Sequence, residues 1–308
     1  MASVSCPRPQ LLGPVTPVWP AAAILGEGIC WSPARQALYW VDILGQRLLR
    51  YTPATQRREQ WQFEVTVSAV AERREAPGLL VTLQKGFAYF DPDADGGRGH
   101  LQPLLEPEPE RPGNRFNDGK CDAQGRFWAG TMDHEGEAPT GALYRFDADR
   151  RCTRVFDAGF PVTNGPTWSL DGRTLYFNDT ARRQIYAFDF DAPTGSLSNQ
   201  RPWLRFSEAD GHPDGMTTDG QGRLWIAHWG GGCVTCHDPI TAAELARVPL
   251  PTGHITNVAF GGPTLGTLYI TSARSKLTEA QLTQQPLAGA LFSVETDAVG
   301  RPASCYAG

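Results

Sequence analysis

The chain has 308 residues, of which 41% are hydrophobic and 20% charged, and it carries a formal net charge of −5. This composition is typical of a globular protein that buries a large core. The negative charge argues against a nucleic-acid partner, because nucleic-acid-binding surfaces are rich in Lys and Arg. No apolar run approaches the roughly 18 residues that cross a bilayer, so we expect no membrane association.

The N-terminal segment and the cysteines point to a reducing compartment. Residues 1–28 lack the basic cluster and following apolar stretch of a signal peptide. The 7 cysteines, an odd number, are scattered along the chain and form no disulfide framework. Together these observations favour a cytoplasmic protein. The sequence leaves the oligomeric state open between a monomer and a weak oligomer.

A short strand-like pattern recurs six times along the chain. Each copy starts at a Gly or polar turn and continues as an aromatic or β-branched run, which is typical of strands bounded by turns. The copies lie 41 to 49 residues apart, at residues 37–42, 78–83, 125–130, 172–179, 222–228 and 266–272. A second run follows each copy, at residues 47–53, 86–92, 141–147, 183–189, 233–239 and 289–295. Helical periodicity is weak, and the best short helix candidate covers residues 276–284.

Repeats of about 40 to 50 residues with several strands each are the signature of propeller blades. Six copies therefore predict an all-β fold, a six-bladed β-propeller. No linker divides the chain, so we expect a single domain over residues 1–308. The N-terminal segment of about 20 residues is expected to supply a strand that closes the last blade.

Polar residues lie ten or eleven positions before an equivalent apolar residue in each first run, which is Leu38, Leu79, Phe127, Leu175, Leu224 or Leu268. The polar residues are Glu27, Ser68, Asn117, Asn164, Asp214 and Asn257. The first strand of each blade lines the central channel, so equivalent positions form a ring around one axis. Carboxylate and amide oxygens suit a hard divalent cation, and two carboxylates balance its charge. The alternative at each single position is an ordinary turn residue, since Asn, Asp and Gly favour turns.

Other motifs give weaker signals. Cys233, Cys236 and His237 match a haem-attachment string, but they fall in a predicted strand, where positions i and i+3 point to opposite faces. Residues 91–96 resemble the start of a calcium-binding loop that lacks its final Glu. His212 adjoins Asp214 and is a candidate to line the site, although we expect it to be a plain loop residue. No G-x-S-x-G motif supports a serine hydrolase.

Five segments closely resemble the gluconolactonase/regucalcin (senescence marker protein) family. They are LGEGICWSP (25–33), NRFNDGKCDAQGRFWAGTM (114–132), TNGPTWSLDGRTLYFNDT (163–180), HPDGMTTDGQGRLWIAHWGGG (212–232) and ITNVAFGGPTLGTLYITSAR (255–274). The resemblance covers about residues 20–295 and implies a six-bladed propeller that binds one divalent metal and hydrolyses sugar lactones. The ending at residues 271–292 is most similar to bacterial aldonolactonases.

The resemblance also implies site residues, motif by motif. The metal ligands are Glu27, Asn164 and Asp214. The substrate-binding residues are Arg115, Asn117 and Glu135, with Glu137 an equal candidate because residues 133–140 depart from the family pattern. The metal is left open among Ca, Zn, Mg, Mn and Fe(II), and the substrate among glucono-, xylono- and arabinonolactone.

The implied chemistry is ester hydrolysis. A divalent metal polarises the lactone carbonyl and stabilises the oxyanion, and either Asp214 or a water on the metal acts as the base. Two alternatives remain, because fold alone does not establish function. One is a non-enzymatic propeller that serves as a metal-binding regulator or scaffold. The other is a propeller esterase or phosphotriesterase, although Arg115 and Asn117 favour a polyhydroxylated substrate.

Overall fold

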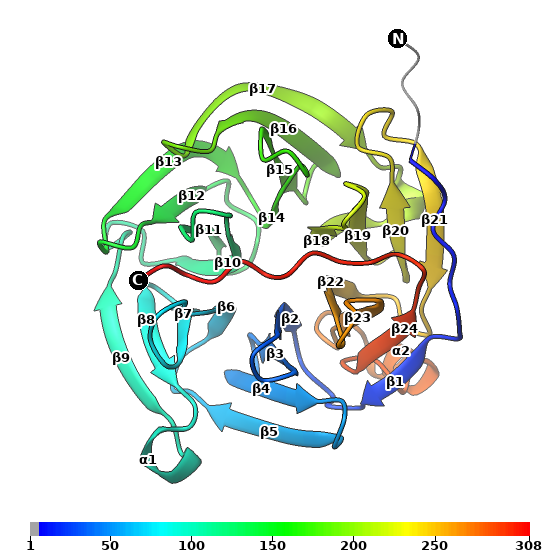
Figure 1. Ribbon diagram of the computed structural model, residues 1–308, viewed down its shortest axis with the longest axis horizontal. Coiled ribbons are helices and arrows are strands. Elements are labelled where there is room, and N and C mark those ends of the chain that lie inside the picture. The colour runs from blue at the N-terminus through cyan, green and yellow to red at the C-terminus, as the bar shows by residue number, and fades with distance from the viewer. Residues whose placement is uncertain (1–5) are drawn as a thin grey trace.

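The computed structural model describes residues 6–308 and contains six four-stranded antiparallel sheets arranged around one axis (Figure 1). The predicted six-bladed β-propeller is therefore confirmed. We number the blades in chain order, so that blade 1 contains β2 to β5 and blade 6 contains β22 to β24 together with β1. Residues 1–5, the start of the segment expected to close the last blade, lie outside the described residues.

The two inner strands of each blade correspond to the repeats of the sequence. The innermost strands are β2 (Gly26–Ser32), β6 (Val67–Glu72), β10 (Asn114–Cys121), β14 (Thr163–Trp168), β18 (His212–Thr218) and β22 (Ile255–Gly261). The second strands are β3 (Ala37–Asp42), β7 (Leu79–Leu83), β11 (Phe127–Asp133), β15 (Thr174–Asp179), β19 (Leu224–Trp229) and β23 (Thr267–Ser272). The second strands coincide with the first recurring run of each repeat, as predicted.

The outer strands complete each blade at the rim. The third strands are β4 (Arg47–Thr52), β8 (Phe87–Asp91), β12 (Gly141–Phe146), β16 (Gln184–Asp191), β20 (Cys233–His237) and β24 (Leu291–Glu295). The outermost strands are β5 (Arg57–Gln62), β9 (His100–Leu105), β13 (Cys152–Phe160), β17 (Ser196–Arg205), β21 (Glu244–Pro249) and β1 (Thr16–Trp19). Because β1 pairs antiparallel with β24, an N-terminal strand joins the last blade and links the two ends of the ring.

The core lies between neighbouring blades, which explains why the second strands are apolar on both faces. All six residues of β3 are buried, and Trp128 of β11 has no exposed surface. Its ring packs edge-on against Trp168 and Phe190 of the next blade, with centroids 6.2 and 5.7 Å away. Each blade thus buries both sheet faces, and aromatic side chains fill the widening gap between blades.

The C-terminal segment crosses one mouth of the central channel (Figure 1). The amide of Gly220 donates to the Val299 carbonyl at 2.8 Å, and the Tyr306 amide donates to the Glu72 carbonyl at 2.7 Å. Tyr306 is fully buried and stacks on Phe146, with ring centroids 5.6 Å apart. Since these contacts lie at the ends of innermost strands, the segment covers the mouth opposite the strand starts.

Helical structure is short. The pieces are α1 (Ala94–Gly97), the 3-10 turn η1 (Glu208–Asp210) and α2 (Glu279–Gln284). Helix α2 falls within the predicted residues 276–284, and Thr278 caps it by accepting from the Gln281 amide. Among residues 6–308, no helix is long and apolar enough to cross a membrane.

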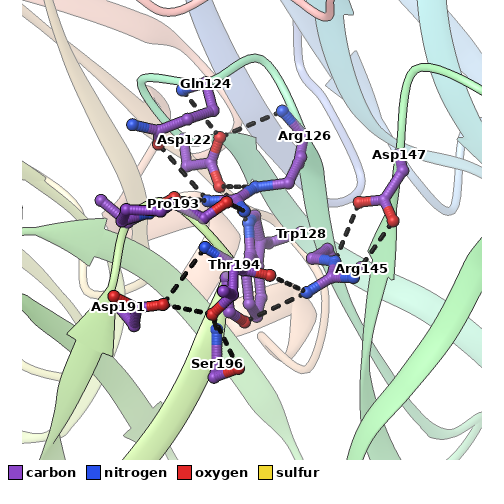
Figure 2. A network of polar contacts seen from close by, with 12 residues as sticks. Asp122, Gln124, Arg126, Trp128, Arg145, Asp147, Asp191, Pro193, Thr194 and Ser196 are labelled. Atoms are coloured by element: carbon purple, nitrogen blue, oxygen red, sulfur yellow. Dashed lines mark hydrogen bonds and ion pairs between the residues drawn. The ribbon is translucent and has the colours of Figure 1, made fainter.

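Buried aspartates at the blade corners tie the turns between the first and second strands. Asp122 accepts from Arg126 Nε at 2.6 Å and from the Trp128 indole at 2.8 Å (Figure 2). Beside this corner, Arg145 of β12 donates to the Thr194 carbonyl of the β16–β17 turn at 2.8 Å, which links blades 3 and 4. Such a network fixes the packing of neighbouring blades.

Candidate metal and substrate site

A bulge in each innermost strand turns a polar side chain toward the axis. The pairing register shifts between Glu27 and Cys30 in β2, and between Asn164 and Thr167 in β14. Both bulges continue with a glycine at positive φ, Gly28 at 55° and Gly165 at 52°. The left-handed backbone favours glycine and re-aims the preceding side chain. The G-E-G and T-N-G strings of the sequence are therefore bulges within strands.

Gly215 follows Asp214 for a different reason. The register of β18 shifts between Pro213 and Met216. A Cβ atom on Gly215 would lie 2.1 Å from the amide carbon of Asn257, which is a severe clash. Only glycine lets blades 5 and 6 approach this closely on the axis.

One cavity of about 450 Å³ opens at the mouth where the innermost strands begin. Its polar lining includes all six candidate residues, which are Glu27, Arg115, Asn117, Glu135, Asn164 and Asp214. Glu137 does not line the cavity, and its amide instead donates to Asp133 Oδ2 at 3.1 Å. The structure thus brings together residues from blades 1, 3, 4 and 5, and it favours Glu135 over Glu137 as the side chain that faces a ligand.

Two carboxyl groups of the cavity lining are deeply buried. Glu27 and Asp214 are each 4% exposed, and Asp214 Oδ1 has no hydrogen-bond partner. Burial, followed by the charge of Asp118, raises the pKa of Glu27 to about 8. Burial and then the charge of Glu27 raise the pKa of Asp214 well above its usual range. A bare, buried acceptor beside a second carboxylate is the environment that a divalent cation stabilises.

A chain of side-chain hydrogen bonds holds the amide of Asn164. Arg115 Nη1 donates to Asn117 Oδ1 at 2.7 Å, and Asn117 Nδ2 donates to Asn164 Oδ1 at 2.7 Å. Asn164 Nδ2 then donates to Thr180 Oγ1 at 3.0 Å. These contacts direct the oxygen of Asn164 toward blade 3 and the cavity. Burial lowers the pKa of Arg115 to about 10, so its guanidinium remains charged at neutral pH.

Two positions of the predicted ring lie outside the cavity lining. Ser68 Oγ pairs with Thr82 Oγ1 of its own blade at 2.9 Å. Asn257 Nδ2 donates to Glu27 Oε2 at 3.0 Å, so it supports a cavity residue from behind. The ring of six oxygens expected from the register is therefore reduced to four residues that line the cavity, Glu27, Asn117, Asn164 and Asp214.

Sequence reasoning missed Asp118, which is 3% exposed and adjoins Asn117 in the bulge of β10. Both of its oxygens accept backbone N–H bonds, from Gly165 at 2.7 Å and Gly119 at 2.8 Å. Among residues 6–308, no group of three or more His, Cys, Asp and Glu side chains has a metal-binding arrangement. The candidate metal set therefore depends on the Asn164 amide. The N-D-G string contained the signal for Asp118, because a bulge can turn two neighbours inward.

Aromatic and basic residues at the cavity mouth were also missed. Trp229 stacks on His254, with ring centroids 3.9 Å apart and an interplanar angle of 12°. Lys276 lines the cavity from the loop after β23. His212, expected to be a loop residue, instead begins β18, lines the cavity and contacts the Thr180 carbonyl through Nδ1 at 2.9 Å.

The other sequence motifs fall outside this cavity. Cys233 and Cys236 are buried free thiols of β20. The segment that resembles a calcium-binding loop ends β8 and forms α1 at the rim. Neither contributes to the cavity lining.

Comparison with known proteins identifies relatives over nearly the whole chain. The family model described as SMP-30/Gluconolactonase/LRE-like region matches residues 25–274. The chain is 38% identical to regucalcin of Danio rerio over 92% of this chain and 95% of the relative. It is 36% identical to L-arabinolactonase of Azospirillum brasilense over 92% of each.

A solved structure gives the same result. A calcium-binding protein, regucalcin, from Agrobacterium tumefaciens superposes with a TM-score of 0.88 at 29% identity, covering 98% of this chain and 97% of that chain. The strand arrangement, the extent of the match and the level of identity agree with one another. The chain belongs to the SMP-30/gluconolactonase/regucalcin family.

Proposed function

We propose that this protein is a metal-dependent lactonase that hydrolyses a sugar lactone, an aldonolactone, to the aldonic acid. The observation that carries the proposal is the buried, unpartnered Asp214 Oδ1 beside Glu27, in a cavity that also holds a buried guanidinium. The L-arabinolactonase name of a relative supports the substrate class. The cavity of about 450 Å³ is in the size range of small-molecule sites.

Glu27, Asn164 and Asp214 are the residues that would hold the metal. All three offer oxygen, which favours a hard cation such as Ca²⁺, Mg²⁺ or Mn²⁺ over Zn²⁺, which prefers nitrogen and sulfur. The calcium-binding description of the Agrobacterium regucalcin agrees with this choice. When bound, such a cation polarises the carbonyl of a lactone and stabilises negative charge on its oxygen.

The side chains of this protein supply the remaining steps. Arg115 and Asn117 bind and orient the sugar hydroxyls through charge-assisted and neutral hydrogen bonds, and Glu135 accepts from a hydroxyl. Asp214 accepts a proton from the water that attacks the ester carbon. The ring C–O bond then breaks, and the former ring oxygen takes the proton back from Asp214 and leaves as a hydroxyl. The product is an open-chain hydroxy acid.

A lactone panel tests the proposal. Purified protein is treated with a chelator, dialysed, and assayed with gluconolactone, xylonolactone and arabinonolactone in the presence of one divalent metal at a time, by acid release in weakly buffered solution. We expect metal-dependent hydrolysis above a blank of buffer plus free metal. An aryl ester and a phosphotriester serve as competing substrates.

Each outcome is decisive. Faster turnover of the aryl ester or phosphotriester than of every lactone favours the esterase alternative. Metal binding without hydrolysis of any compound favours a metal-binding regulator or scaffold.

A further inference from the structure

Asp118 lies on the axis beneath the candidate metal ligands, and its oxygens face donors instead of the cavity. Oδ2 accepts from the Gly165 amide at 2.7 Å. Oδ1 accepts from the Gly119 amide at 2.8 Å and lies 3.4 Å from Asn257 Nδ2. A carboxylate that is occupied by N–H groups on both oxygens is a poor direct ligand. Its role in the site therefore depends on the groups to which it is hydrogen-bonded.

The hydrogen bonds of Asp118 connect it to two candidate metal ligands, Asn164 and Glu27. Gly165 is the residue after Asn164, so its hydrogen bond fixes the backbone that carries the Asn164 amide. Asn257 donates to both Asp118 Oδ1 and Glu27 Oε2, at 3.4 and 3.0 Å. One carboxylate on blade 3 therefore connects a ligand on blade 4 with a ligand on blade 1, through the amide of blade 6.

Lys120 completes the arrangement two residues further along β10. Its Nζ donates to the carbonyl of Met216, two residues after Asp214, at 2.6 Å. The ammonium also lowers the pKa of Asp118, against the stronger rise caused by burial. Residues 118–120 thus connect blade 3 to blades 4, 5 and 6, at the level just below the cavity.

We propose that Asp118 is a positioning residue that sets the separation of Glu27 and Asn164, and thereby the affinity of the site for its divalent cation. The proposal rests on the metal site of the proposed function. It differs from a ligand role, because Asp118 does not line the cavity and accepts only N–H donors. Partners behind metal ligands generally contribute about 10- to 100-fold in metal affinity.

Asp118→Asn tests this role with little change in volume. It replaces one accepting oxygen with an NH₂ group, which must face an N–H group of Gly165, Gly119 or Asn257. We expect calcium to bind about 10- to 100-fold more weakly, measured by titration calorimetry of the full chain with CaCl₂ and repeated with MnCl₂. At saturating Ca²⁺ the variant should recover kcat with an unchanged KM, because the cavity lining is intact.

Asn257→Ala provides a second route to the same bridge. It should weaken Ca²⁺ binding. The double variant should lose little more Ca²⁺ affinity than the more affected single variant, since both substitutions remove the same connection. The matched control is Ser68→Ala, at the equivalent position of blade 2, where the hydroxyl bonds only to Thr82 of its own blade. Its Ca²⁺ affinity should stay within about twofold of wild type.

The outcomes separate this inference from the proposed function. If the wild-type protein binds neither Ca²⁺ nor Mn²⁺, this inference fails, and the lactone panel with the other metals decides the proposed function. If the wild-type protein binds Ca²⁺ and Asp118→Asn binds it within about threefold, only the positioning role is overturned. If Asp118→Asn does not fold, the Ca²⁺ affinity of Asn257→Ala decides. If Asn257→Ala binds Ca²⁺ as tightly as Ser68→Ala does, the positioning role is overturned.

Discussion

Buried aspartates at the blade corners and on the axis occupy contrasting surroundings. Asp122 and Asp219 at the corners are 1% and 0% exposed, and Asp214 on the axis is 4% exposed. Asp219 accepts from Arg223 Nε at 2.6 Å, from the Trp225 indole at 2.9 Å, and from two backbone amides. Asp214 Oδ1 has no partner. At similar burial, the corner aspartate has partners on both oxygens, whereas the axial aspartate has one oxygen without a partner.

The difference separates a structural role from a functional one. A buried carboxylate with its own arginine stabilises the fold through charge-assisted hydrogen bonds. Two buried carboxyl groups that share a single guanidinium are costly to ionise, so they indicate a site that favours binding of a further cation. The spacing D-x-x-x-R-x-W, present at residues 122–128 and 219–225, marks the structural kind.

The largest expected effect concerns activity at the axis. Asp214→Ala removes a candidate ligand and the candidate base together. Loss of one stabilising group costs about 10²- to 10³-fold in rate, so loss of the metal as well should exceed 10³-fold in kcat/KM. Asn117→Ala should lose less, partly in KM, because Asn117 orients hydroxyls.

Rates for both variants must be corrected for spontaneous lactone hydrolysis in buffer with free metal. Near-full, metal-dependent activity of Asp214→Ala on the best lactone would show that the site has been assigned wrongly.

The second expected effect is a change in the free energy of unfolding, which has opposite signs at the blade corner and at the axis. Asp219→Asn leaves Arg223 buried without its counter-charge and should lower the free energy of unfolding by about 3 to 5 kcal/mol. Asp214→Asn should instead stabilise the metal-free protein at neutral pH, on the order of 1 kcal/mol, because burial raises the pKa of Asp214 and this carboxyl therefore favours the unfolded protein, in which it ionises freely. Urea unfolding of the chelated proteins measures both changes. Destabilisation by both substitutions would remove the distinction between corner and axis.

The sequence predicted the blades because each repeats one buried strand pattern at a regular period. The outermost strands of blades 1 to 5 escaped prediction, since they carry few buried apolar residues, whereas the N-terminal strand of blade 6 was expected. In β5, for example, Trp61 is the single buried side chain. The C-terminal crossing also escaped, because it is held by backbone hydrogen bonds and by Tyr306 rather than by a periodic pattern.

The residues of the candidate site also differ in whether the sequence could identify them. Glu27, Asn164 and Asp214 could be found because they occupy equivalent register positions. Asp118 was missed although the N-D-G string marks the bulge in β10, and Trp229 could not be found, since its position depends on packing between blades. Register identifies which residues face the axis, and local backbone geometry decides which neighbours join them.

The third expected effect is a pH dependence of metal binding. Burial raises the pKa of Glu27 to about 8 in the protein without metal, so a proton competes with the cation below that pH. Calcium affinity should therefore fall by roughly tenfold per pH unit for each proton displaced. Calorimetry in buffers of different ionisation enthalpy counts the protons released. An affinity that stays constant between about pH 6 and pH 8 would contradict this linkage.

The pH dependence of the stability of the metal-free protein follows from the same rise in the pKa of Glu27. Because the folded-state pKa of Glu27 lies above the unfolded value, the folded protein binds the proton more tightly. Its contribution to stability is fully present below about pH 4.5 and is lost as the pH rises through about 8. Saturating Ca²⁺ should remove this decline.

The smallest expected effect concerns His212, which lines the cavity but carries no unsatisfied charge. Its Nδ1 contacts the Thr180 carbonyl at 2.9 Å, and the Thr180 hydroxyl donates to the Pro213 carbonyl at 2.8 Å. His212→Ala should therefore loosen the start of β18 by about one hydrogen bond, or roughly 1 kcal/mol in the free energy of unfolding, and should lower kcat/KM by less than about tenfold. The metal affinity should be unchanged, since Asp214 is held by its own strand. A loss as large as that of Asp214→Ala, with Ca²⁺ binding intact, would make the imidazole a participant in proton transfer and would displace Asp214 as the base.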